Sequence, residues 1–170
     1  ASVFIYSDEL ANYEYSSTHP FKPIRAKLTL DLCRRYDLIE RPWIRLIKPQ
    51  PLNFEELAEF HDETYLKTLQ AIDSSATAKE LWPDVPSSRK EDSLTLDPQI
   101  LQYELGTDDN PIFSGVYDFS ALTAGATDLG AKMVASGEVQ VAFNPVGGFH
   151  HAARNHAEGF CYVNDVAVTI

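Results

Sequence analysis

Cysteine is scarce in this sequence of 170 residues, in which Cys33 and Cys161 are the only two. They lie far apart and lack the spacing of metal ligands, so the sequence predicts no disulfide framework. Long apolar runs are also missing, and no basic and then apolar leader follows Ala1, which excludes an evident membrane span or secretory signal. We therefore expect a reduced, cytoplasmic protein with no membrane partner.

Positive charge is the second shortage. The chain has 14 basic and 25 acidic side chains, a formal net charge of -11. Such a field repels phosphate backbones, and no basic stripe is present, so we expect no nucleic-acid partner. The acidity would suit a cationic substrate such as an amine or a lysine-rich tail, although solubility alone also explains it. At 44% hydrophobic residues, the chain is expected to fold as one domain.

Short β-prone runs alternate with helical patterns along the first seventy residues. Residues 3–6 and 43–47 predict strands. Between them Pro23 suits a first helical turn, and a four-residue repeat predicts a helix that buries the face of Ile24, Leu28, Leu32 and Tyr36. After Asn53, a candidate N-cap, the apolar spacing predicts two short helices joined near residues 61–62.

The rest of the chain continues the alternation after a long loop predicted at about residues 73–113. A helix is expected from about 117 to 135 with Gly137 as its stop, and a buried strand at 139–143 follows. Apolar residues at 163, 166, 167 and 170 predict a last helix without an exit turn. These elements indicate an α/β fold, a three-layer α/β/α arrangement with a mainly parallel sheet that is incomplete at the C-terminus.

Two adjacent histidines are the main chemical signal. The sequence Gly-Gly-Phe-His-His-Ala occupies residues 147–152, directly after the predicted strand at 139–143. Ligand sites in open α/β sheets lie beyond the carboxyl ends of strands, and imidazoles change protonation near neutral pH, as a general base and acid require. An isolated pair of this kind is also explained by histidines that cap turns through hydrogen bonds.

A second motif, Gly-Phe-Cys-Tyr-Val-Asn-Asp, follows at residues 159–165. Together the two motifs resemble the paired signature of the histone deacetylase superfamily, which has the arginase/deacetylase fold and includes class I histone deacetylases, acetoin-utilisation proteins and bacterial deacetylase-like amidohydrolases. The resemblance extends through residues 19–25, 60–66 and 106–115. It implies that residues 1–170 are the N-terminal part of a single zinc-dependent deacetylase domain, acting on acetyl-lysine or a small acetylated amine.

The resemblance also assigns roles to single residues. His150 and His151 match the catalytic histidines that flank a zinc-bound water, with His151 expected as the principal base and acid. Phe160 matches an aromatic wall of the tunnel for the acyl-lysine stem, and Gly159 gives the substrate close access to the backbone. Asp109 matches an acidic rim residue that binds the substrate backbone.

Two further residues match an inner cavity that could hold product acetate, namely Tyr15 and Arg25. For Arg25 a structural ion pair is an equal alternative. The family's zinc ligands are expected beyond Ile170, while His19, His61 and His156 are scattered, so no metal ligand is assigned to this chain and we expect it to be inactive alone.

Two alternatives remain open. The chain could be a non-catalytic binding or association protein that retains half of the deacetylase fold, and an exposed sheet edge would then favour a homo-oligomer. It could also be an unrelated metal-free hydrolase that uses the two histidines. No serine or cysteine nucleophile has an evident triad around it, and Cys161 is expected to be a core thiol.

Overall fold

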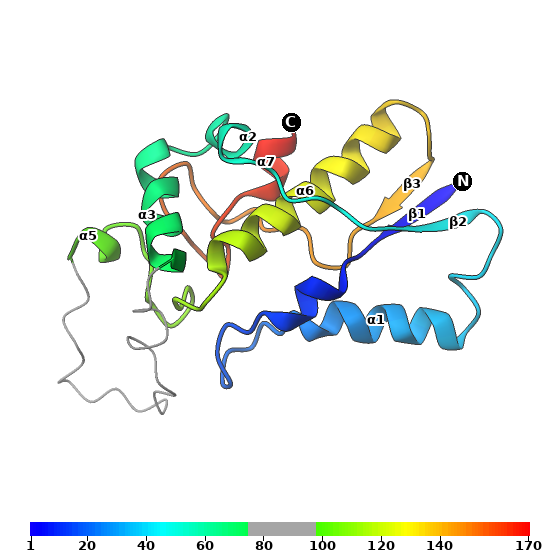
Figure 1. Cartoon of the computed structure of the whole chain (residues 1–170), viewed down its shortest axis with the longest axis horizontal. Helices are drawn as coiled ribbons and strands as arrows, with labels where there is room; N and C mark the ends of the chain where they lie inside the picture. The colour runs from blue at the N-terminus through cyan, green and yellow to red at the C-terminus, as the bar shows by residue number, and fades with distance from the viewer. Residues whose placement is uncertain (75–97) are drawn as a thin grey trace.

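The computed structural model describes residues 1–74 and 98–170. Its elements alternate along the chain as the sequence predicts (Figure 1). In order they are β1 (Ser2–Ile5), the 3-10 helix η1 (Asp8–Asn12), α1 (Ile24–Arg35), β2 (Ile44–Ile47), α2 (Phe54–Ala58), α3 (Glu63–Ser74), α5 (Pro98–Leu101), α6 (Val116–Ala135), β3 (Val141–Phe143) and α7 (Asp165–Thr169).

The three strands form one parallel sheet in the order β2-β1-β3. Alternate residues of the central strand β1 supply the two faces, because successive side chains of a strand point to opposite sides. Val3 and Ile5 pack with residues of α6, whereas Phe4 packs on the other side with the core that includes Leu30 of α1. Helices therefore cover both faces of the sheet (Figure 1), and the predicted three-layer α/β/α arrangement is confirmed.

The predicted orientation of α1 is wrong. Leu28, Leu32 and Tyr36 are 58%, 55% and 68% exposed, while Ala26 and Leu30 are buried. Residues two apart lie roughly 200° apart around a helix, so the sequence holds two apolar stripes on opposite sides of α1. A four-residue repeat cannot tell which stripe faces the sheet, and the stripe with the small Ala26 is the one that packs.

The burial predicted for the last strand and helix is also wrong in part. Val139 is buried, but Val141 and Phe143 of β3 are 56% and 48% exposed. Parallel strands are buried only where both faces are covered, and β3 is an edge strand among the described residues. In α7 the expected apolar face is mostly open, because Val166 and Ile170 are exposed while Val163, just before the helix, is buried.

Helix boundaries follow the predicted signals closely. The Asn53 side chain accepts from the Glu56 amide and the Glu56 side chain accepts from the Asn53 amide, so α2 begins with a capping box. Gly137 follows α6 with φ 76° and ends it as expected. Residues 75–97 of the predicted loop at 73–113 lie outside the described ranges. Within those ranges, no helix has both the length and the apolar character that crossing a membrane requires.

Close approach of the backbone fixes α6 in place. A Cβ at Gly125 would lie 1.9 Å from the carbonyl oxygen of Gln50, where the segment between β2 and α2 crosses the helix. The Leu52 amide donates to the Ala121 carbonyl at 3.1 Å in the same crossing. At Gly130 a Cβ would lie 3.1 Å from the Ile5 side chain and 3.2 Å from that of Ala142. Both glycines therefore allow a close approach to α6.

These two glycines give a matched pair of variants. We expect Gly125→Ala to lower the free energy of unfolding by about 2 kcal/mol or more, because the obstructing atom is backbone and cannot rotate away. Gly130→Ala should change it by less than about 1 kcal/mol, since Ile5 Cδ1 at 3.1 Å is the end of a flexible side chain, the Ala142 Cβ at 3.2 Å has to move only slightly, and alanine favours the helix. Urea unfolding followed by circular dichroism measures both, and equal losses would contradict the account.

Candidate active site

The two histidines lie on the loop that leaves the carboxyl end of β3. Their side chains are exposed, and the two imidazole rings are 4.3 Å apart between centroids at 33°. The His150 Nδ1 atom is 2.9 Å from the Gly148 carbonyl oxygen, so Nδ1 carries the proton in the neutral ring. The His150 Nε2 atom is then left with a lone pair that can accept a proton.

Two glycines shape this loop for different reasons. A Cβ at Gly147 would lie 2.5 Å from Asn144 Nδ2 and 2.7 Å from Thr127 Oγ1, so there is no room for a side chain. A Cβ at Gly148 would meet nothing within 4 Å, but its φ of 100° is a conformation that favours glycine. Packing requires the first glycine, and backbone conformation requires the second.

A buried carboxylate lies beneath the loop. Asp165, at 1% exposure, accepts from the Gly148 amide at 2.8 Å and from the Phe149 amide at 2.7 Å. The Thr127 hydroxyl of α6 also donates to it, and this hydroxyl accepts from Asn144 Nδ2 at 3.0 Å. The donors to this buried carboxylate are therefore supplied by the loop and by α6, and Asn144, the residue after β3, donates to the Thr127 hydroxyl.

Asn164 holds the second half of the loop. Its Nδ2 donates to the His150 carbonyl at 3.1 Å and to the Ala152 carbonyl at 2.9 Å. Its Oδ1 accepts from the Ala167 amide at 2.9 Å and so caps α7. The carbonyl groups of the residues on either side of His151 are thus bonded to one amide side chain.

His61, between α2 and α3, supports Asn164 from behind. Its Nε2 accepts from the Asn164 backbone amide at 3.0 Å, and its Nδ1 lies 3.1 Å from the Arg154 carbonyl, to which it donates. Burial is the main reason that the pKa of His61 falls from 6.5 to about 4. Because Nε2 must accept a bond, His61 is a neutral structural histidine rather than a proton carrier.

The second motif packs directly against the first. A Cβ at Gly159 would lie 3.0 Å from Cγ of His151, so the absence of a side chain lets the chain pass against that ring. Phe160 follows with φ 73°, a conformation that costs a residue with a side chain about 1–3 kcal/mol. The buried Tyr15 hydroxyl donates to the Phe160 carbonyl at 2.7 Å and holds this conformation.

His19 links Phe160 to the residue predicted at the rim. Its ring packs edge-on against Phe160 with centroids 4.6 Å apart. Its Nδ1 accepts from the Phe21 amide at 3.1 Å, so Nε2 carries the proton and donates to the Asp109 carbonyl at 3.2 Å. The Asp109 side chain is exposed.

Six of the seven predicted site residues are therefore joined through direct contacts or through His19. They are His150, His151, Gly159, Phe160, Tyr15 and Asp109. The exception is Arg25, whose exposed side chain lies on the first turn of α1. The thiol of Cys161 is buried, donates to the Gly159 carbonyl at 3.3 Å, and has its pKa raised mainly by burial. It is a core thiol as expected.

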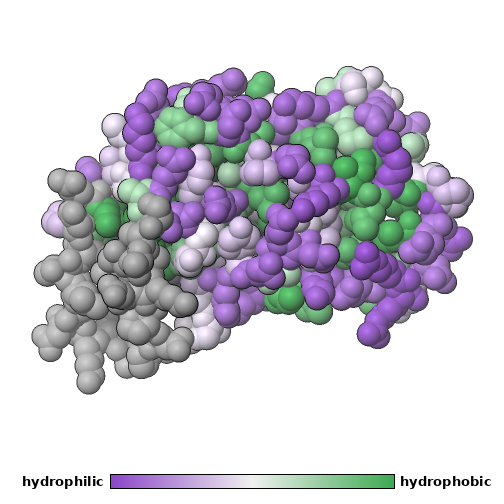
Figure 2. Space-filling model, in the orientation of Figure 1, coloured by the Kyte–Doolittle hydropathy of each residue, from purple (hydrophilic) through white to green (hydrophobic). Residues whose placement is uncertain are grey.

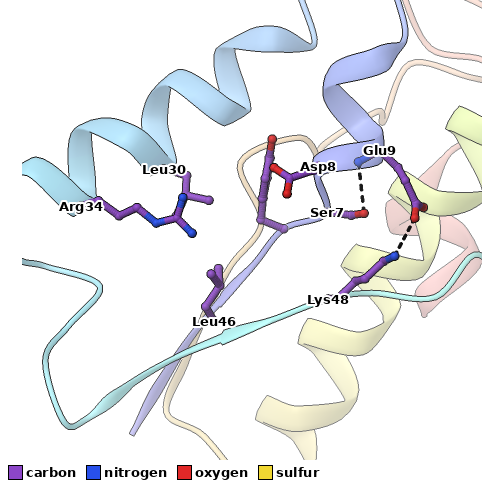
Figure 3. Close-up of a pocket in the computed structure, with 8 residues that line it drawn as sticks. Ser7, Asp8, Glu9, Leu30, Arg34, Leu46 and Lys48 are labelled. Atoms are coloured by element: carbon purple, nitrogen blue, oxygen red, sulfur yellow. Dashed lines mark hydrogen bonds and ion pairs between the residues drawn. The ribbon is translucent and has the colours of Figure 1, made fainter.

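A separate pocket lies at the carboxyl ends of β1 and β2 (Figure 3). Its volume is about 310 Å³, and side chains of both charges line it, including Asp8, Arg34 and Lys48. The Lys48 ammonium is paired with Glu9 at 2.6 Å. None of the predicted site residues lines this pocket, so it is not the candidate active site.

Sequence reasoning missed the residues that hold the loop. Asn164 and Asp165 belong to the second motif, but the sequence prediction assigns them no role, although an Asn-Asp pair before an apolar helix is an N-cap signal. Thr127 gives no local signal, since its partner Asp165 is 38 positions away. His19 and His61 were seen only as scattered histidines. In residues 1–74 and 98–170, no three His, Cys, Asp or Glu side chains gather to form a metal site.

Comparisons with known proteins give one consistent family. Residues 19–170 match the histone deacetylase domain. The chain is similar to histone deacetylase clr6 of Schizosaccharomyces pombe, with 31% identity over 97% of this chain and 36% of that protein. It is similar to human histone deacetylase 1, with 29% identity over 98% of this chain and 31% of that protein. Histone deacetylase RPD3 of Saccharomyces cerevisiae is 29% identical over 99% of this chain and 34% of that protein.

The chain spans about a third of the length of these curated relatives.

The buried neutral His61 predicts a pH dependence of stability. The unfolded chain gains the His61 proton near pH 6.5 and the folded chain only near pH 4, so stability is present above 6.5 and is lost as the pH falls. The full loss is about 3 kcal/mol, of which about 1 kcal/mol falls between pH 7 and pH 5.5. In His61→Asn this contribution should vanish.

Urea unfolding at pH 7 and pH 5.5 measures the effect as a difference between proteins. His156→Asn is the matched control, because His156 is partly exposed, with Nδ1 3.0 Å from Asn155 Oδ1 and Nε2 3.9 Å from Glu158, and a surface pair of this kind contributes little to stability. The control should retain the wild-type dependence on pH. A His61→Asn protein that loses as much stability as wild type on acidification would rule out the role given to His61.

Proposed function

This chain belongs to the histone deacetylase domain family, and we propose that it supplies the proton-handling half of a deacetylase site. The complete site would hydrolyse the acetyl amide of acetyl-lysine or of a small acetylated amine. One observation carries the proposal: two exposed imidazoles, 4.3 Å apart between ring centroids, lie on a hydrogen-bonded loop at a strand end, with the Gly159 backbone against His151.

The chain's own residues would act on both sides of the amide bond. An imidazole at His150 or His151 takes a proton from the attacking water, and an imidazolium then gives a proton to the departing amine. The His150 Nδ1 bond to the Gly148 carbonyl orients that ring for the first step. His151 as the principal base and acid remains a prediction, because both rings reach the open side of the loop.

The substrate would be held by the second motif and its neighbours. We propose that Phe160 packs along the aliphatic stem of an acyl-lysine and that the exposed Asp109 carboxylate binds the substrate backbone. His19 supports both assignments, since it packs on the Phe160 ring and bonds the Asp109 carbonyl. An acetate cavity around Tyr15 and Arg25 is less well supported, because the Tyr15 hydroxyl is engaged by the Phe160 carbonyl and Arg25 is exposed.

Zinc is expected for the complete family domain, but the residues that the structure describes do not form a zinc site. A catalytic zinc needs three convergent protein ligands. No group of three His, Cys, Asp or Glu side chains in the described parts of the chain has that arrangement. We therefore propose that the metal ligands of a complete site come from outside these residues, and no step is assigned to the metal here.

The proposal predicts inactivity alone and activity on complementation. Purified chain with added zinc should show no chelator-sensitive release of acetate from an acetyl-lysine peptide. Co-expression with the part of the Schizosaccharomyces pombe relative that this chain does not cover should restore deacetylation. His150→Ala or His151→Ala should then reduce it by about 100-fold or more, whereas His156→Ala, outside the pair, should not.

Two outcomes would contradict the proposed function. Zinc-dependent deacetylation by the chain alone would show that it holds a complete site. A complemented enzyme that is indifferent to both histidine substitutions would show that the pair is not catalytic.

An alternative role as an association protein is favoured by one observation. Hydrophobic side chains gather at the surface over the strands (Figure 2). Val141 and Phe143 of β3, which is an edge strand among the described residues, are about half exposed. An open, apolar strand edge is a template for pairing with another chain. We propose that the chain forms homo-oligomers through this edge.

Light scattering over a range of concentrations tests the association. Wild type should show a mass that rises with concentration, and the double variant Val141→Lys with Phe143→Lys should remain monomeric. Val134→Lys, at an exposed position of α6, is the matched control and should behave as wild type. A wild-type chain that stays strictly monomeric at high concentration would contradict the proposal.

A further inference from the structure

We propose that Asp165, oriented by Thr127, is the positioning residue of the histidine pair. The inference rests on the proposed function, because it takes His150 and His151 to be the residues that move protons. Asp165 does not touch either imidazole. Its carboxylate acts through the backbone of the loop that carries them.

The bonding of Asp165 separates this role from helix capping. The side chain that caps α7 is that of Asn164, which accepts from the Ala167 amide. The Asp165 carboxylate instead accepts from Gly148 and Phe149, seventeen and sixteen positions earlier in the chain. It is buried at 1% exposure, where an unpaired carboxylate is costly. Its contacts serve the loop.

Two successive amides on one carboxylate define the direction in which the loop continues. Phe149 N lies 2.7 Å from Oδ1 and Gly148 N lies 2.8 Å from Oδ2, so the peptide plane between the two residues has little freedom to turn. Gly148 adopts φ 100° at this point, and His150 follows two residues later. A rotation of this peptide group would redirect both imidazoles.

Thr127 fixes the carboxylate itself. Its hydroxyl accepts from Asn144 Nδ2 at 3.0 Å and donates to Oδ2 of Asp165. Asn144 Oδ1 in turn accepts from the Val146 amide at 3.1 Å. Gly147 lies so close to Asn144, Thr127 and Asp165 that a side chain would displace all three. The carboxylate is therefore held between α6 and the start of the loop.

The continuation of the loop is held by the neighbouring residue. Asn164 Nδ2 bonds the carbonyl groups of His150 and Ala152, so the backbone is fixed before the pair by Asp165 and around His151 by Asn164. The rings themselves remain exposed. This arrangement leaves the imidazoles free to exchange protons while their positions are set.

The experiment uses Asp165→Asn and Thr127→Val, with Asp128→Asn as the matched control. Asp128 precedes Leu129 on α6, is 16% exposed and pairs with the exposed Lys132 at 2.7 Å as an i,i+4 pair, so its change removes a carboxylate charge that makes no bond to the loop. Amide hydrogen exchange at Gly148 and Phe149 reports the two bonds. Exchange at Phe4 and Ile5 in the central strand reports whether the chain remains folded.

We expect exchange at Gly148 and Phe149 to rise about tenfold or more in Asp165→Asn, because an amide group offers one acceptor where the carboxylate offers two. Cross-relaxation between the ring protons of His150 and His151, which lie close enough to give it at a centroid distance of 4.3 Å, should weaken. Thr127→Val should give a smaller change of the same kind. Asp128→Asn should give none.

The complemented enzyme provides the functional readout. In Asp165→Asn we expect kcat to fall by about tenfold or more while KM changes less than threefold, since the residue does not contact substrate. Unchanged exchange and ring cross-relaxation in both loop variants would overturn the positioning role. So would altered exchange with full kcat.

The failure of this inference is distinguishable from the failure of the proposed function. If His150→Ala and His151→Ala leave the complemented activity intact, the function fails, although the exchange results still measure the Asp165 contacts. If those substitutions abolish activity and Asp165→Asn does not, the positioning role fails and the function stands. Should Asp165→Asn lose protection at Phe4 and Ile5, the smaller Thr127→Val change decides the question.

Discussion

The contact between the Asp165 carboxylate and the Gly148 and Phe149 amides is the interaction on which the site depends. It is the last of several packing and hydrogen-bond contacts that begin in the sheet. Gly130 lets α6 lie against Ile5 of β1, and Thr127, one helical turn away, then reaches the carboxylate. The loop starts at the end of β3, which pairs with β1 in the same sheet. The sheet therefore supports both α6, which carries Thr127, and the loop to which Asp165 binds.

The histidines of the chain divide into two chemical kinds according to burial. His19 and His61 are buried, and each uses both ring nitrogens to bond backbone groups, so their tautomers are fixed. His150 and His151 are exposed, with ring centroids 4.3 Å apart, and His156 is partly exposed but lies outside the pair. Proton transfer needs a ring that the substrate can reach, and the exposed pair on the loop after β3 meets that requirement.

Local sequence signals predicted the elements well, and failed where a distant contact decides. The alternation of strands and helices, the Asn53 cap and the Gly137 stop are each set by a few neighbouring residues. The buried side of α1 depends on which of two apolar stripes meets the sheet. The contact of Thr127 with Asp165 joins two helices, so no local pattern indicates it. The cytoplasmic location stays a prediction.

The central claim is that this chain carries the proton-handling half of a deacetylase site and that the metal half lies elsewhere. Titration of zinc into the purified, metal-free chain by isothermal calorimetry tests it most directly. The account predicts no saturable binding at one ion per chain, and no change when His150 and His151 are both replaced by alanine. Stoichiometric binding of one zinc ion that survives dialysis and is lost in that double variant would contradict it.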